Sequence, residues 1–204
     1  MLRKVSFSLL GVLCLATSYA QDSTKEAPKA TTITGWVDVY YRFNFANPKD
    51  KSINNYTSFT NSQNSFELGM ATVRLDHSFG KASATVDLGF GRRAQEFAYT
   101  DGAGWPVGSG NGFVSLSNIK QAYLSYAVSD KFKLTMGKWA THVGYELLDA
   151  PLNRNYSMSY MFSYGPFSHT GIKADISLTK KTAIMVGVAN PTDYATTTSS
   201  SKFV

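Results

Sequence analysis

The chain has 204 residues, of which 43% are hydrophobic, 14% aromatic and 17% charged. Its formal net charge of +6 is a mild excess without a basic run, so we expect no nucleic-acid partner. The single cysteine, Cys14, lies in an N-terminal segment that we expect to be removed, which excludes disulfides and thiolate sites from the mature chain.

Residues 1–20 have the pattern of a cleavable secretion signal. Arg3 and Lys4 form a basic start, residues 7–16 are mostly apolar, and Ser18-Tyr19-Ala20 precedes the expected cut. Because the apolar core is too short to span a bilayer, a retained membrane anchor is the less favoured alternative. A secreted protein without disulfides needs another source of stability, and a closed hydrogen-bonded barrel would supply it.

After a polar segment at 21–34, which we expect to be a flexible periplasmic lead-in, the chain alternates repeatedly between apolar and polar residues. The clearest case is Gly171 to Leu178, in which every second residue from Ile172 is apolar and those between are polar or Gly. Successive strand side chains point to opposite faces, so such a segment has one apolar and one polar face. We predict seven strands of this kind, at about residues 36–45, 67–78, 81–90, 120–128, 131–138, 171–178 and 182–190. The alternation is unclear before Gly69-Met70, which is consistent with a β-bulge there.

Short and long connections alternate between these strands. We expect tight turns around Phe79-Gly80, Ser129-Asp130 and Lys180-Lys181, and long connections at about residues 46–66, 91–119 and 139–170. Short turns at one rim and long loops at the other are typical of outer-membrane barrels, in which the long loops face outside. We therefore predict an all-β fold, an antiparallel transmembrane outer-membrane β-barrel over residues 35–204.

The predicted strand number bears on how the barrel closes. Bacterial single-chain barrels have an even number of strands, whereas seven are predicted here. The stretch 195–201 is rich in Thr and Ser, and no strand ending in an aromatic residue follows it. Since an open sheet edge in lipid leaves costly unpaired backbone groups, we expect either that the chain is the N-terminal part of a longer protein or that partner chains complete it.

One region carries several short motifs in a fixed order. They are Met136-Gly137-Lys138-Trp139, His142-Val143-Gly144-Tyr145-Glu146, Pro151-Leu152-Asn153-Arg154-Asn155-Tyr156-Ser157 and Gly165-Pro166-Phe167-Ser168-His169-Thr170-Gly171. Over about residues 137–190, their order and spacing resemble the OmpL-like β-barrel porin family (β-barrel porin 2) of Gram-negative bacteria. The resemblance implies an outer-membrane porin longer than this chain and does not fix a solute. Phosphate-selective porins share a loosely similar Gly-Lys…Gly-x-Glu stretch and stay open as a second family.

The long connection at 139–170 contains three charged residues, Glu146, Asp149 and Arg154, among many aromatic ones. It either folds into the lumen as a constriction whose charges set ion preference, or contributes aromatics to an interfacial girdle with its charges solvated. The girdle is the commoner use, so the constriction is the less favoured interpretation. Trp36, Tyr41 and Trp139 are also expected in interfacial belts.

Charged residues on the predicted polar faces carry both signs. Basic residues on a lipid face would cost about 2–4 kcal/mol at the bilayer midplane, so we assign these residues to a wet lumen. The predicted pore-lining residues are Asp38, Arg42, Arg74, Asp76, Asp87, Lys133, Lys173 and Asp175.

Signals for an enzyme are weak. His77, His142 and His169 lie far apart in the sequence without metal-ligand spacing, so we predict no catalytic residue, metal or cofactor. The leading function is passive diffusion of small polar solutes or ions through a water-filled barrel in the cell outer membrane, surrounded by outer-membrane lipid, with a homo-oligomer left open. The alternatives are a surface adhesin or receptor that binds through its long loops and, less favoured, a hydrolase at the barrel rim.

Overall fold

The structure is a computed structural model that describes residues 31–47, 49, 58–99, 116–198 and 200–202. The strands of this part are β1 (Thr31–Arg42), β2 (Ser65–Phe79), β3 (Ala82–Phe90), β4 (Ile119–Ser129), β5 (Phe132–Ala140), β6 (Ser168–Ser177) and β7 (Ala183–Ala189). A short helix, α1 (Arg92–Phe97), follows β3, and 3-10 turns occur at Leu116–Asn118, Ala150–Leu152 and Tyr160–Tyr164. The predicted secretion signal lies outside the described residues, and β1 begins at Thr31, within the segment predicted as a lead-in.

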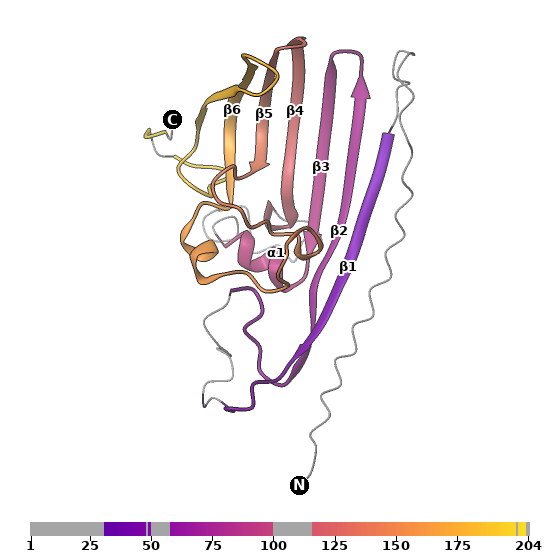
Figure 1. Cartoon of the computed structure of the whole chain (residues 1–204), viewed down its shortest axis with the longest axis vertical. Helices are drawn as coiled ribbons and strands as arrows, with labels where there is room; N and C mark the ends of the chain where they lie inside the picture. Colours follow the sequence, from indigo (N-terminus) through magenta and orange to yellow (C-terminus); the bar gives the residue numbers. More distant parts are fainter. Residues whose placement is uncertain (1–30, 48, 50–57, 100–115, 199, 203–204) are drawn as a thin grey trace.

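The strands form one antiparallel sheet in which they lie in sequence order, from β1 at one edge to β7 at the other (Figure 1). Each strand pairs with the next one along the chain, so every connection is a hairpin connection. The predicted all-β antiparallel fold is confirmed. Within the described residues, no helix is long and apolar enough to cross a membrane.

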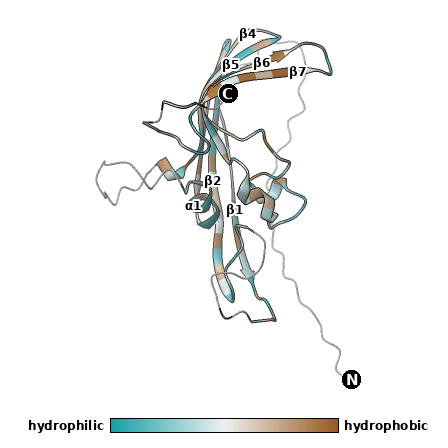
Figure 2. Cartoon of the chain, turned by 90° about the vertical axis from the view of Figure 1, so that its left-hand side faces the viewer, coloured by the Kyte–Doolittle hydropathy of each residue, from teal (hydrophilic) through white to brown (hydrophobic). Residues whose placement is uncertain are grey.

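The two faces of the sheet differ sharply in chemistry, and hydrophobic and hydrophilic residues follow one another in short bands along the strands (Figure 2). One face, called the apolar face below, exposes large hydrophobic side chains such as Val37 (71%), Leu124 (61%) and Met136 (66%). These are the alternate residues that the sequence pattern placed together. Each would cost roughly 1.5–3 kcal/mol of lost burial in water, so this face is suited to lipid.

Two β-bulges adjust which residues reach the other face, called the polar face below. Asp38 pairs with Met70 and Val39 with Leu68, so Gly69 is an extra residue, at the place where the alternation was unclear. A Cβ atom at Gly69 would lie 2.2 Å from Oδ2 of Asp38, which explains why a glycine occupies this position. A second bulge places Lys120 opposite no residue of β3, because Asp87 pairs with Gln121 and Leu88 with Ile119.

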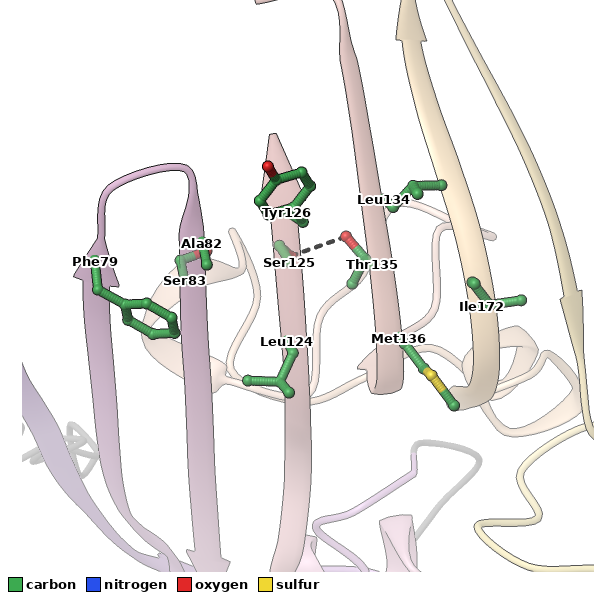
Figure 3. Close-up of a pocket in the computed structure, with 10 residues that line it drawn as sticks. All are labelled: Phe79, Ala82, Ser83, Leu124, Ser125, Tyr126, Leu134, Thr135, Met136 and Ile172. Atoms are coloured by element: carbon green, nitrogen blue, oxygen red, sulfur yellow. Dashed lines mark hydrogen bonds between the residues drawn. The ribbon is translucent and has the colours of Figure 1, made fainter. Parts of the chain in front are cut away.

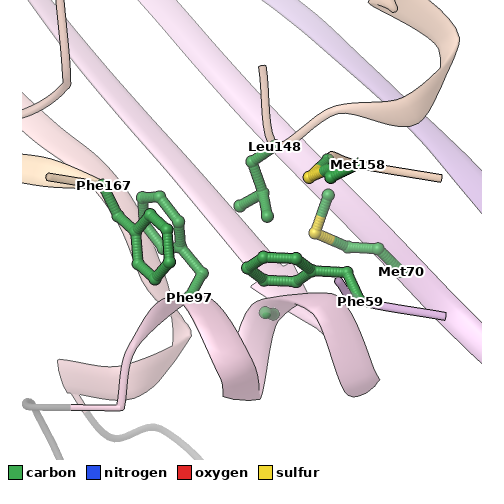
Figure 4. Close-up of a cluster of buried hydrophobic side chains, with 7 residues drawn as sticks. Phe59, Met70, Phe97, Leu148, Met158 and Phe167 are labelled. Atoms are coloured by element: carbon green, nitrogen blue, oxygen red, sulfur yellow. The ribbon is translucent and has the colours of Figure 1, made fainter. Parts of the chain in front are cut away.

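The long connections pack onto the polar face, where they enclose a small hydrophobic cluster (Figure 4). Met70 of β2 belongs to it and lies on the same face as Thr72 and Arg74. The other members come from all three long connections: Phe59, Ala94, Phe97, Leu148, Met158 and Phe167. Phe167 contacts the rings of Phe97 and Phe162 at centroid distances of 5.7 and 5.2 Å. Such aromatic pairs add about 0.5–1.5 kcal/mol each and hold the connections to one another, while Met70 and Trp36 join the cluster to the sheet.

Candidate functional site on the polar face

The predicted pore-lining residues all project from the polar face. Thr72 and Thr85, which alternate with exposed apolar neighbours, are buried on this face and mark its orientation. The charged residues divide into a group covered by the long connections and a group left open toward the tight turns. The covered group contains Asp38, Arg42 and Asp87, and the open group contains Arg74, Asp76, Lys133, Lys173 and Asp175.

The first ionic cluster joins β3 and β4 to the connection after β5. Nζ of Lys120 lies 3.2 Å from Asp87 and 2.6 Å from Oδ1 of Asp149, and both the Lys120 and Asp87 side chains are about 95% buried. Nε2 of Gln121 also donates to Oδ2 of Asp87 at 3.3 Å. A buried charge without a partner is costly, so this lysine depends on its two carboxylates. Asp149 is therefore a tether between the loop and the sheet.

The second cluster joins β1 to α1 and to the same connection. The hydroxyl of Tyr156 donates to both oxygens of Asp38, at 2.7 and 2.8 Å. Nε of Arg93, which is fully buried, lies 3.3 Å from Asp38, and its Nη2 donates to the carbonyl of Tyr156 at 2.9 Å. The Arg93 guanidinium also lies 4.7 Å from the centroid of the Tyr156 ring. Burial, followed by the hydrogen bond to Asp38, raises the pKa of Tyr156 well above its usual value, which keeps its hydroxyl a donor.

The open group lies in two pairs of neighbouring strands. Arg74 forms a bidentate pair with Asp76, with its Nε 2.7 Å and its Nη2 3.0 Å from the two carboxylate oxygens, and Thr85 donates to Asp76 at 2.7 Å. Asp175 lies between Lys133 at 3.7 Å and Lys173 at 3.4 Å. More than a third of the Arg74 side chain and of the Asp76 side chain is exposed, so both charges can contact solvent or a solute in front of the polar face.

The three charged residues of the long connection have different environments. Asp149 is the tether to Lys120 described above. Glu146 accepts hydrogen bonds from the backbone N–H of Ser159 at 2.8 Å and from its hydroxyl at 2.5 Å, which closes the loop on itself. Arg154 is exposed. Of the three charged residues, the structure therefore brings only Asp149 onto the polar face of the sheet.

Sequence reasoning missed two residues that organise this face, Lys120 and Arg93. Lys120 reaches the polar face only because of the bulge opposite β3, and its departure from the alternation of the fourth predicted strand was the available signal. Arg93 belongs to α1, which lies within the long connection predicted at about residues 91–119. A six-residue helix leaves too little periodicity to be recognised.

The aromatic and histidine positions also differ from expectation. Tyr41 is exposed at the edge of the apolar face, as an interfacial residue would be, whereas Trp36 packs against the hydrophobic cluster and Trp139 is buried beneath Lys173. The predicted belt is therefore wrong for both tryptophans, since each projects from the polar face. His142 and His169, distant in sequence, have ring centroids 5.1 Å apart. Even so, the described residues contain no group of three or more His, Cys, Asp or Glu side chains that could hold a metal ion.

Comparison with known families agrees with this geometry. The family model described as "Putative beta-barrel porin-2, OmpL-like" matches residues 30–203, which covers all the strands. No curated protein and no solved structure matches the chain significantly. Family membership supports porin activity and an outer-membrane location at the level of the family, without naming a solute. The chain belongs to the OmpL-like β-barrel porin-2 family.

Proposed function

We propose that this chain forms part of the wall and the constriction of a water-filled pore through which small polar solutes or ions diffuse passively across the outer membrane. The observation that carries the proposal is the division of the sheet into an exposed apolar face and a charged face on which the long connections are docked. An apolar band outside and a polar interior are the arrangement of membrane barrels that conduct solutes.

The docked connection supports a constriction rather than an aromatic girdle. Asp149 and Tyr156 fix it to the sheet at two points, on β4 and on β1. It also packs on the polar face through the hydrophobic cluster, and Thr141 bonds to Nε2 of His169 in β6 at 3.0 Å. A loop held in this way narrows the space in front of the sheet, and the charges beside it would set the preference for one sign of ion.

The open charges give the pore both signs of charge near the tight turns. Arg74 and Asp76 neutralise one another, and Asp175 is shared by two lysines. The local excess is therefore weakly basic, which supports a mild preference for anions. Membership of a family of porins supports a role without catalysis.

Single-channel conductance in a planar bilayer, with a salt gradient across it, tests this function. The full-length protein should give discrete, long-lived conductance steps, and the reversal potential should give its ion preference. A folded barrel that shows no conductance would contradict the proposed pore and would favour a binding role for the long loops.

A surface receptor is the second function, favoured by one observation. Tyr145 (76%), Met161 (82%) and Tyr164 (74%) of the connection after β5 are among the most exposed large side chains of the described residues. Tyrosine offers both a ring and a hydroxyl for contact with a glycan or a protein. A receptor would bind cells or glycans equally well after Arg74 is neutralised, and would lose binding when Tyr145 and Tyr164 are changed to serine.

A further inference from the structure

The polar face carries two further lysines where its strands meet the tight turns. The N–H of Ala127 donates to the carbonyl of Lys81 at 2.8 Å, and the N–H of Ser177 donates to the carbonyl of Lys131 at 2.8 Å. Each lysine lies two positions before a polar-face residue of the strand that follows it, so both lysines occupy polar-face positions. Both are exposed, and the turn that contains Lys131 also contains one acidic residue, Asp130.

Lys81 belongs to a row of cross-strand neighbours on the polar face. It lies opposite Ala127. Ala127 in turn lies opposite Lys133, which lies opposite Asp175. Because adjacent strands are about 4.8 Å apart, the Cα atoms of Lys81 and Lys133 are separated by about 10 Å. The methyl group of Ala127 leaves space between them that both long side chains can reach, so two ammonium groups can approach one anion above Ala127.

Hydroxyl groups form the next row of the polar face, beside the two lysines. Ser125 and Thr135 lie opposite each other on β4 and β5, two positions from Ala127 and from Lys133. Their side-chain oxygens are 2.9 Å apart and share one hydrogen bond, which is the dashed line in Figure 3. A pair of hydroxyls has two hydrogens and uses only one of them in this bond. The second hydrogen is left for an acceptor on the polar face.

The carboxylates of this part of the sheet do not cancel the charge of the lysines. Within the part of the chain that the structure describes, neither Lys81 nor Lys131 has a carboxylate partner. Asp175 lies 3.7 Å from Lys133 and 3.4 Å from Lys173, so one carboxylate serves two ammonium groups. The polar face therefore has a positive excess near the tight turns, which attracts anions to it.

We propose that the space above Ala127 binds the phosphate group of a small solute between Lys81 and Lys133. The hydroxyl pair of Ser125 and Thr135 supplies a further donor from the neighbouring row. Two cations on opposite sides of one point favour a dianion over a monovalent ion. A lysine binds phosphate as a point charge, whereas the planar fork of an arginine suits the bidentate binding of a carboxylate. This inference rests on the proposed pore, because it names the class of solute that the pore passes.

The phosphate comes from a solute, since the lipid-suited face is the opposite one. Leu124, Tyr126 and Met136, whose side chains are drawn in Figure 3, alternate with the residues of the phosphate site and are exposed on the apolar face. Successive side chains of a strand point to opposite faces. A lipid headgroup would therefore approach the wrong side of β4 and β5.

Isothermal titration calorimetry of the full-length protein in a non-ionic detergent, with inorganic phosphate as the titrant at mildly alkaline pH, tests the site. Phosphate is largely a dianion under these conditions and should bind, whereas chloride at the same ionic strength should not. The variant K81Q/K133Q should weaken phosphate binding by about tenfold, because it removes both charged donors. The variant K81R/K133R, which keeps both charges, should recover most of the affinity.

The matched control is K180Q/K181Q, which removes the same charge from the exposed turn between β6 and β7, two strands that are not neighbours of β4. It should bind phosphate as the unchanged protein does. Equal losses in K81Q/K133Q and in the control would indicate a general charge effect and overturn the site, as would the absence of phosphate binding to the unchanged protein. A heat-modifiable gel shift verifies that each variant is folded.

The titration requires no ion current, so the outcome for the site is distinguishable from the outcome for the pore. A protein that conducts ions and binds no phosphate would refute the phosphate site and leave the proposed pore standing. A folded protein that binds phosphate through Lys81 and Lys133 but does not conduct would support the site and refute the pore.

Discussion

Lys120 of β4 places its ammonium 2.6 Å from the carboxylate of Asp149, a residue of the long connection after β5. The contact exists because the bulge opposite β3 turns Lys120 onto the polar face, where Asp87 already lies. One displaced residue at the start of β4 therefore creates the position at which the long connection after β5 is attached. The docked loop, together with the sheet, then bounds the space in front of the polar face.

The variant Asp149→Asn should loosen this attachment. Lys120 keeps Asp87 as a partner, so we expect a loss of roughly 1–3 kcal/mol in loop docking rather than unfolding of the sheet. Single-channel conductance should rise and become noisier as the loop moves. Asp130→Asn is the control, because it makes the same chemical change at an exposed tight turn. Conductance that is equal in both variants would contradict a constriction by this loop.

The variant Tyr156→Phe isolates the second attachment. It removes the hydroxyl that donates to Asp38 and retains the ring against Arg93. Because Asp38 still has Arg93, the free energy of unfolding should fall by about 1–2 kcal/mol, measured by urea titration in lipid vesicles. Tyr164→Phe serves for comparison, since Tyr164 bonds only an exposed Tyr160 in the described part of the chain, and should change stability by less than about 0.5 kcal/mol. Losses of the same size in both variants would count against a docking role for Tyr156.

Tyr99 makes the stability of the folded protein fall at high pH. Its hydroxyl donates to Asp193 at 3.0 Å, and burial, followed by the Asp193 charge, raises its pKa from about 10 to about 12. The folded protein therefore favours the neutral phenol. This contribution to stability is complete below pH 10 and disappears as the pH rises through about 12. Urea titrations across this window should show a steeper loss for the unchanged protein than for Tyr99→Phe, and parallel curves would contradict the assignment.

Most of the sheet could be predicted from the sequence because the signal is local. A strand between lipid and water must alternate between apolar and polar residues, so the sequence from Gly171 to Leu178 predicts which side chains lie on each face. The interruption of this alternation at Gly69 indicated the position of a bulge. The docking contacts could not be predicted, because they join residues with no shared local pattern. Tyr156 and Asp38 lie 118 positions apart, and nothing in either neighbourhood indicates the other. The two tryptophans were misplaced because aromatic character was weighed above the alternation: an interfacial belt requires the apolar face, whereas Trp36 and Trp139 project from the polar face.

The open charges offer the most direct test of the lumen. Arg74→Glu would leave two carboxylates side by side, since position 74 lies against Asp76 and Asp76 retains Thr85. A pore that passes this point should become more cation-selective, with a shifted reversal potential in a salt gradient, and Arg74→Gln should shift it in the same direction by less. Lys180→Glu makes the same charge change at an exposed turn and should have a smaller effect, because surface charges are screened within about 8 Å at physiological salt. If conductance persists and the reversal potential does not respond to Arg74, then ions do not pass the polar face of this sheet, and the assignment of its charged residues to a lumen is wrong.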